Sequence, residues 1–335
     1  MEFNGFNIEP QSGSAGTDMP ISISIATVNE GLDKTVELNA VSGDKIDTLT
    51  LFHEGMREEL ISADGKVLKD INGVILAALK SIKKVNPILT NYLTVTALED
   101  GFTTTFGNAC EYCVDGDGQW KSLSANTTTP SINTGQTLSF RARLTPNTSN
   151  GIGAFSLKKK AKIQGDAKSM LFADDAPNHT SLSGYDYAFM GLFYNNHNLI
   201  EIGDDLLTAT ALSISCYRRM FQSCTGLVKT MSILPATNLA QYCYRDMFRG
   251  CSAMTDSPIL PAKTLVAYCY SYMYYYCTAL SKITALFTTL SPSTATQNWV
   301  TSVASTGTFV KASDATWNQT GASGTPSGWT IIKEG

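Results

Sequence analysis

A nine-residue pattern that recurs every 26 to 27 residues constrains this chain more than any other feature. Each copy begins and ends with cysteine and has methionine at its centre. The three copies read CYRRMFQSC at 216–224, CYRDMFRGC at 243–251 and CYSYMYYYC at 269–277. A repeat of this length cannot bury its apolar side chains alone, whereas stacking of successive copies does bury them. The pattern therefore predicts a short solenoid.

The apolar positions within each copy predict how the copies pack. Cysteine, methionine and cysteine at i, i+4 and i+8 fall on one face of a helix, and a proline-containing L-P-A-x-x-L element before two of the copies predicts an extended or turn segment. A degenerate copy lies upstream, with Ala188, Leu192 and Asn196 at the equivalent positions. The expected repeat core consists of Cys216, Met220, Cys224, Cys243, Met247, Cys251, Cys269, Met273 and Cys277.

The element C-Y-x-x-M-F-x-x-C-[ST]-x-L resembles the BspA-type leucine-rich repeats of Bacteroidetes surface proteins and of phages that infect them. The resemblance covers about residues 182–332. It implies a surface for recognition or adhesion rather than an enzyme, and it identifies no ligand.

The cysteine spacing predicts buried free thiols. Cys216 and Cys224 lie about 12 Å apart on a helix, whereas a disulfide needs Cα atoms within about 7 Å. Cys110-x-x-Cys113 has no second ligand pair for zinc, and it precedes a hairpin signal in a stretch that we expect to be a strand. Free thiols are typical of proteins that assemble in a reducing cytoplasm.

Residues 1–62 alternate apolar and polar side chains in short runs at 21–25, 36–38 and 49–51, which predicts an Ig-like β-sandwich. The segments at 8–13 (IEPQSG) and 50–55 (TLFHEG) resemble the opening and closing segments of the BACON domain, a β-sandwich module of Bacteroidetes surface proteins and their phages. Residues 63–90 predict a partly helical connector that ends at Pro87.

Residues 91–165 predict a second β-domain, with alternation at 93–97 and 138–144 and a hairpin turn at 115–118. The lysines at 158–160 and Lys162 are expected on the wet face of a strand. The repeats are expected to span 166–290, and the Ser/Thr/Gly-rich stretch 291–335 is expected to form a C-terminal cap.

Four tyrosines of the third copy, Tyr268, Tyr272, Tyr275 and Tyr276, are the candidate binding residues. If the cysteines and methionine of this copy face inward, several of these rings are partly exposed, and exposed aromatic clusters often mark interfaces. The alternative is that the tyrosines cap the solenoid against residues 286–335.

Composition and motifs argue against several function classes. Only 16% of residues are charged, the net charge is −4 and no long basic run occurs, so we expect no nucleic-acid partner. No run of 18 apolar residues predicts a membrane span. The three histidines lie in no metal or nucleophile motif. We therefore expect no catalytic residues, no metal and no cofactor.

These patterns predict a multidomain, mainly β protein with a C-terminal leucine-rich-repeat solenoid of the α/β type. The expected function is a phage virion component, a head or tail fibre whose N-terminal domain binds capsid or tail proteins and whose solenoid contacts a host surface glycan or protein. The N-terminus shows no secretion signal, which agrees with virion assembly in the host cytoplasm. We expect a homo-oligomer, such as a trimer. The alternative is a leucine-rich-repeat adhesin on the bacterial cell surface.

Overall fold

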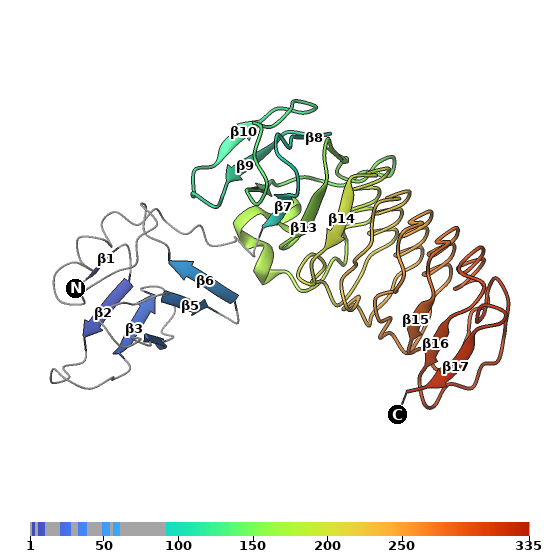
Figure 1. The fold of residues 1–335 in the computed structure, drawn as a ribbon. Coiled ribbons are helices and arrows are strands. Elements are labelled where there is room, and N and C mark those ends of the chain that lie inside the picture. Colours follow the sequence, from blue (N-terminus) through green and yellow to red (C-terminus); the bar gives the residue numbers. More distant parts are fainter. Residues whose placement is uncertain are drawn as a thin grey trace. The chain divides into compact units, whose positions relative to one another are not determined.

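The fold is described from a computed structural model of the 335-residue chain (Figure 1). The structure describes residues 92–334 and six strands of the N-terminal part. The chain divides into two compact units, Met1–Pro87 and Ile88–Gly335. The N-terminal strands are β1 (Glu2–Phe3), β2 (Phe6–Pro10), β3 (Ile21–Thr27), β4 (Asp33–Leu38), β5 (Leu49–His53) and β6 (Met56–Leu60).

In the first unit, strands β1 to β4 form an antiparallel sheet in chain order, and β5 pairs with β6. The alternating runs predicted as strands are confirmed as β3, β4 and β5. The predicted connector at 63–90 lies outside the described residues. The side chains of this unit, and therefore the predicted sandwich core, also lie outside the described residues.

The second unit begins with a six-stranded sheet, in the order β10-β9-β11-β7-β13-β14. All neighbouring strands are antiparallel except β13 and β14, and β8 pairs with β12 beside this sheet. The strand predicted for 93–97 is confirmed as β7, but four of its five side chains are fully buried, Thr94 among them, so the polar positions do not alternate with the apolar ones in exposure. The strands are β7 (Leu93–Ala97), β8 (Thr104–Phe106), β9 (Cys110–Val114), β10 (Lys121–Leu123), β11 (Thr137–Arg141), β12 (Phe155–Leu157), β13 (Ala161–Gln164) and β14 (Leu199–Ile202).

The lysine cluster lies elsewhere than expected. Lys158, Lys159 and Lys160 are exposed in the turn between β12 and β13, and only Lys162 lies on a strand. The turn is held by the backbone bond from Lys158 to Thr103 and by the ion pair of Lys160 with Glu99 at 3.3 Å. The three consecutive lysines lie where strand pairing is interrupted, and they form part of the turn.

A buried ion pair lies between the sheet and the coils that follow it. The short helix α2 (Ser169–Phe172) continues into a 3-10 turn, η1 (Ala173–Asn178). Just before α2, Lys168 contacts Asp166 at 3.2 Å, and both side chains are buried. Asp166 also accepts a hydrogen bond from Thr208 at 3.0 Å. Burial raises the pKa of Asp166, and the bonds with Lys168 and Thr208 oppose that rise.

From residue 187 onward the chain winds into coils that stack side by side (Figure 1). Amides of one coil donate to carbonyls of the next, as Tyr217 N does to Cys243 O at 2.9 Å and Tyr244 N to Cys269 O at 3.0 Å. Matching segments of successive coils, which we call turn segments, occupy residues 187–196, 215–224, 242–251, 268–277 and 294–303.

The turn segments are not α-helical, so the helix predicted for each repeat is wrong. Every second amide donates three residues back in its own coil, as Met220 N does to Tyr217 O. The amides between them donate to the next coil. A left-handed φ recurs at every fourth residue, at Ser215, Arg219 and Ser223. The backbone therefore repeats every four residues instead of 3.6, and it keeps the cysteines and methionine of a repeat in line.

Two ladders of stacked aromatic rings run through the coils. One joins Phe189, Tyr217, Tyr244 and Tyr270, with neighbouring ring centroids 5.6–5.8 Å apart. The other begins at Phe155 in β12 and reaches Tyr274, with centroids 5.4–6.0 Å apart. Both ladders end at Trp299, which is fully buried. The second ladder makes one continuous core of sheet and coils.

A ladder of thiols runs beside the rings. All nine residues of the expected repeat core are fully buried, and all eight cysteines are buried and free. Cys224, Cys251 and Cys277 each donate to a carbonyl of the preceding coil, at 2.9–3.1 Å. In the first coil Asn196 takes this position. Its amide donates to Phe155 O at 2.8 Å and accepts from the backbone of β12, so it joins the stack to the sheet.

The C-terminal stretch, expected to be a cap, contributes a further turn segment. Ala295 and Trp299 replace the first cysteine and the methionine of the pattern, so the repeat was not visible in the sequence. The parallel strands β15 (Lys282–Ala285), β16 (Thr308–Lys311) and β17 (Thr330–Lys333) pair in that order along another side of the last coils.

We expect Trp299→Ala to lower the free energy of unfolding by about 3–5 kcal/mol, because it removes the ring that ends both ladders. It also removes the indole hydrogen bond to Gly324 O. Urea unfolding of the full chain, followed by near-UV circular dichroism, measures the loss. Trp120→Ala is the control, since Trp120 is half-buried and lies outside both ladders. An equal loss in the two variants would contradict a special role for the ladders.

We also expect the chain to lose stability as the pH rises above about 8.5, the pH at which unfolded cysteines ionise. Burial raises the pKa of Cys216, Cys224 and Cys277 to about 12, so the folded chain keeps these protons. The stabilisation is complete below the unfolded pKa and is lost as the pH rises toward the folded value. Urea midpoints at about pH 7.5 and about pH 9.5 measure it.

Cys224→Ala tests the assignment of this pH dependence to the thiols. The variant should show a weaker decline of the urea midpoint with pH, whatever its stability at neutral pH. Rapid modification of the native chain by a thiol reagent at neutral pH would contradict the burial of the thiol ladder.

Candidate binding surface

The outward positions of the turn segments form one face of the coil stack. In each nine-residue pattern the first, second, fifth, sixth and ninth residues are buried. The residues between them are at least partly exposed, except Asp246 and Ser271, which are buried. In the second to fourth turn segments these positions carry mostly arginine and tyrosine. We call this surface the arginine–tyrosine face, and it comprises Arg218, Arg219, Arg245, Arg249, Tyr272, Tyr275 and Tyr276.

One buried carboxylate organises the arginines. Asp246 is 1% exposed and contacts Arg249 at 3.2 Å, Arg245 at 3.3 Å and Arg219 at 4.0 Å. The charge of Arg218 also acts on this cluster, so four arginines are offset by a single carboxylate. The face therefore carries an excess of three positive charges, although the whole chain has a net charge of −4.

Arg218 has the least compensated charge of the four arginines. Partial burial lowers its pKa, and the neighbouring charges of Arg219 and Arg245 lower it further, against the opposing effect of Asp246. Within residues 92–334, its Nε atom and the Oε1 atom of Gln222 are buried without a hydrogen-bond partner. These two residues are four apart in one turn segment.

The tyrosines continue the face into the next coil. Arg245 lies 5.6 Å from the ring centre of Tyr272, and Arg249 lies 4.9 Å from that of Tyr275. Tyr275 and Tyr276 make an edge contact at 4.6 Å. Tyr276 is 52% exposed. Cations and rings thus form one continuous surface rather than two separate patches.

Tyr268, Tyr272 and Tyr276 occupy strained backbone positions, with φ of 60°, 55° and 61°. A left-handed conformation costs a residue with a side chain about 1–2 kcal/mol. At the position of Tyr276 the other turn segments carry Asn195, Ser223, Gly250 and Ser302, whereas Tyr187 and Tyr242 occupy the position of Tyr268 in other coils. Strain of this kind persists where a side chain has a role that the backbone does not require. Tyr276 is therefore better explained by what it presents at the surface.

The structure separates the tyrosines of this coil into two groups. Tyr270 and Tyr274 are buried and contact Trp299, so they belong to the core. Tyr268 is half-buried and stacks on Tyr242 at 5.0 Å. The four tyrosines predicted from the sequence as binding residues are the four that reach the surface. The arginines and Asp246 were missed, although arginine recurs at the same position in two copies.

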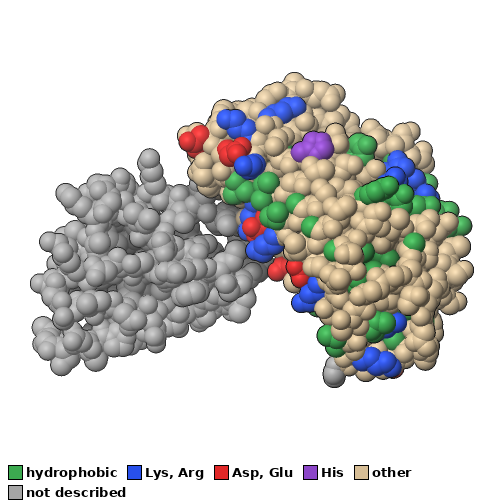
Figure 2. Space-filling model, turned by 45° about the vertical axis from the view of Figure 1, so that its right-hand side comes forward, with side chains coloured by type: hydrophobic (Ala, Val, Ile, Leu, Met, Phe, Trp, Pro, Cys, Tyr) green, Lys and Arg blue, Asp and Glu red, His purple; other side chains and the backbone are tan. Residues whose placement is uncertain are grey.

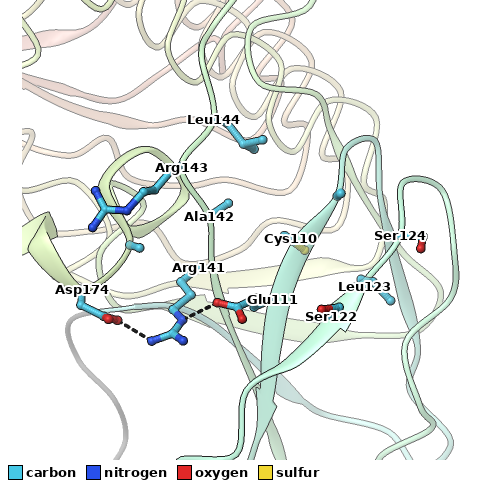
Figure 3. A pocket seen from close by; sticks show the side chains of 12 residues that line it. Cys110, Glu111, Ser122, Leu123, Ser124, Arg141, Ala142, Arg143, Leu144 and Asp174 are labelled. Atoms are coloured by element: carbon cyan, nitrogen blue, oxygen red, sulfur yellow. Dashed lines mark hydrogen bonds and ion pairs between the residues drawn. The ribbon is translucent and has the colours of Figure 1, made fainter.

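A hollow of about 510 Å³ beside the sheet is a weaker candidate (Figure 3). Its floor contains Arg141, which pairs with Glu111 at 2.8 Å and with Asp174 at 2.7 Å. Arg141 also lies 4.2 Å from the ring centre of Trp120. Arg143 extends away from this cluster (Figure 3). The charges in the hollow are thus largely satisfied by one another.

Residues with reactive side chains are held in structural contacts. Cys113 donates to Asp117 at 3.1 Å, and burial raises the pKa of Cys110 to about 12. His179 stacks on Phe172, and His197 hydrogen-bonds with Thr225 at 2.8 Å, while the side chain of His53 lies outside the described residues. Over the described part of the chain, no three His, Cys, Asp or Glu residues are grouped to hold a metal ion.

Comparison of the chain with family models, with curated proteins and with solved structures finds no match. Among the described residues, no helix combines the length and apolar character needed to cross a membrane. Most of the surface visible in Figure 2 belongs to backbone and uncharged polar side chains, and charged groups gather in a few places. The arginine–tyrosine face is accordingly the strongest candidate site.

We expect Asp246→Asn to lower the free energy of unfolding by about 1–3 kcal/mol, because three nearby guanidinium groups lose their shared partner. Asparagine accepts a left-handed φ readily, so the substitution changes charge without adding backbone strain. Thermal and urea unfolding measure the effect. Asp256→Asn, at an exposed carboxylate of the same stack, is the control and should leave stability nearly unchanged. Unchanged stability of Asp246→Asn would show that this carboxylate does not hold the arginines.

Proposed function

We propose that this chain is a structural protein of a bacteriophage virion, a head or tail fibre that presents the arginine–tyrosine face to the host surface. The observation that carries the proposal is the exposed ring of Tyr276 at a left-handed backbone position that Ser223 and Gly250 fill in the two preceding coils. A protein that needed only a stable fold would not keep bulky rings there. A surface that keeps a large ring at a strained backbone position is suited to binding.

The stacked coils support a leucine-rich-repeat-like solenoid of the BspA type. Each coil adds 26 to 28 residues, and each one buries the same positions against its neighbours. Such arrays offer extended surfaces for recognition. In this proposal the N-terminal unit, which resembles a BACON domain, binds capsid or tail proteins and anchors the fibre.

The free thiols favour a virion protein over a bacterial surface adhesin. Eight buried thiols without a disulfide suit a protein that folds in a reducing cytoplasm, where virions assemble. An adhesin of the same repeat family would fold after secretion, in a more oxidising environment. The adhesin therefore remains the second candidate.

The last strand supports association into a homo-oligomer, such as a trimer. Strand β17 is the edge of its sheet, and its Ile331 and Ile332 are 47% and 48% exposed. Exposed apolar side chains on an unpaired strand edge favour pairing with another chain. No chemical step is part of the proposed function, and the fibre acts by binding alone.

Peptide mass spectrometry of purified virions tests the proposal. We expect peptides from both units at a fixed ratio to the major capsid protein, in virions of the phage that encodes the chain. Separation of heads from tails before the measurement assigns the fibre to one of them. Detection of the protein on bacterial cells, with none in washed virions, would contradict the proposal and favour the adhesin.

A further inference from the structure

We propose that the arginine–tyrosine face binds an acidic carbohydrate chain, with its carboxylate or sulfate groups on the arginines and its sugar rings on the tyrosines. The inference deepens the proposed function, because it rests on that face being the surface shown to the host. It names a chemical class of ligand that the proposed function leaves open.

The charge of the face selects for an anion. Three guanidinium groups pair with the single carboxylate of Asp246, and Arg218 adds a fourth positive charge; Asp246 is itself 1% exposed and inaccessible to a ligand. Arg219 and Arg249 still expose 46% and 40% of their side chains. The planar guanidinium group matches the two oxygens of a carboxylate or sulfate. An acidic ligand would relieve the mutual repulsion of the arginines.

Buried polar atoms beneath the face have no hydrogen-bond partner. Within the described residues they include Arg218 Nε, Arg245 Nε and Gln222 Oε1. These atoms have almost no exposed surface, so a ligand meets the exposed parts of the arginines and tyrosines instead.

The tyrosines supply the surface on which sugar rings stack. Tyr276 is 52% exposed, and Tyr272 and Tyr275 present partly buried rings beside it. Tyrosine offers a large apolar area together with a polar hydroxyl, which suits a sugar ring with an apolar face and a hydroxylated rim. The next coil continues the face with Asn298 and Ser302, which are uncharged hydrogen-bonding residues.

The repeating backbone favours a polymer over a small molecule. Equivalent positions of successive coils lie one behind another, at the spacing of 5.5–6.0 Å seen in the aromatic ladders. Arginines occupy two neighbouring coils, and tyrosines the coil after them. A polymer that runs along the stack contacts the arginines of two coils and then the tyrosines of the next coil. It therefore needs acidic groups for the arginines and sugar rings for the tyrosines.

The same observations favour a carbohydrate over a nucleic acid. Nucleic-acid sites commonly neutralise about 6–10 phosphates along an extended basic stripe. Here the basic groups of the face are confined to two coils, and the whole chain is acidic. A short acidic segment of a glycan fits this limited patch better than a long phosphate backbone.

Matched polymers test the proposal on the full chain. The probes are polygalacturonate, its fully methyl-esterified form, dextran sulfate, dextran, polyacrylate and a single-stranded oligonucleotide. We expect polygalacturonate or dextran sulfate to bind, and binding to fall by at least about tenfold for the neutral partner of the same backbone. Binding should also weaken with added salt, because the contacts are ionic and partly exposed.

Variants assign the binding to the face. Arg219→Gln with Arg249→Gln should weaken binding of the acidic polymer by about tenfold or more. Lys263→Gln with Lys282→Gln removes the same charge from exposed positions of the stack off this face, and should change binding by less than about twofold. Tyr276→Ala should weaken polygalacturonate binding about threefold to tenfold and leave polyacrylate binding unchanged. Near-UV circular dichroism checks that each variant is folded.

Three results would overturn the inference. Equal binding of the charged polymers and their neutral partners would exclude recognition of the acid. Equal binding of polyacrylate and polygalacturonate, without an effect of Tyr276→Ala, would exclude recognition of the sugar. Tighter binding of the oligonucleotide would assign the face to nucleic acid. None of these results changes the virion measurement, so failure of this inference and failure of the proposed function are separable.

Discussion

The alternation of backbone hydrogen bonds in the turn segments is the constraint on which the rest of the second unit depends. An α-helix keeps its amides for bonds within itself, whereas here every second amide reaches the next coil. Coils tied in this way must stay in register, so residues at equivalent positions lie over one another. Aromatic rings therefore meet aromatic rings, and thiols meet carbonyl groups of the preceding coil. The ladders follow from the backbone.

The same constraint couples the fold to the surface. A period of four places a left-handed residue at regular outward positions, where glycine or a small polar residue fits with least strain. Gly191 and Gly250 meet that preference, and Tyr272 and Tyr276 depart from it. Because the inward positions are fully engaged in the core, these outward positions are where one coil can differ from another. If the face binds a ligand as proposed, its specificity is determined by residues that cost the fold some stability.

The sequence predicted the repeat and its buried positions, but not the local conformation. The spacing of Cys216, Met220 and Cys224 is compatible with a period of 3.6 and of four, and no side chain reveals which amides bond between coils. The last turn segment was missed because Trp299 stands where a methionine was expected. The arginine cluster was not predicted because charged residues were considered only by their position in the sequence. The stack brings Arg219 and Asp246 together from different coils.

The two ends of the stack are closed to different degrees, and this difference bears on how a fibre would assemble. At the first coil, Asn196 and the ring of Phe155 join the stack to the sheet. At the last coil, Trp299 ends both ladders, but β17 leaves a strand edge with exposed isoleucines. Strand edges favour association with other chains. Because β17 belongs to a different side of the coils than the turn segments, subunits joined there would leave the arginine–tyrosine face free to bind.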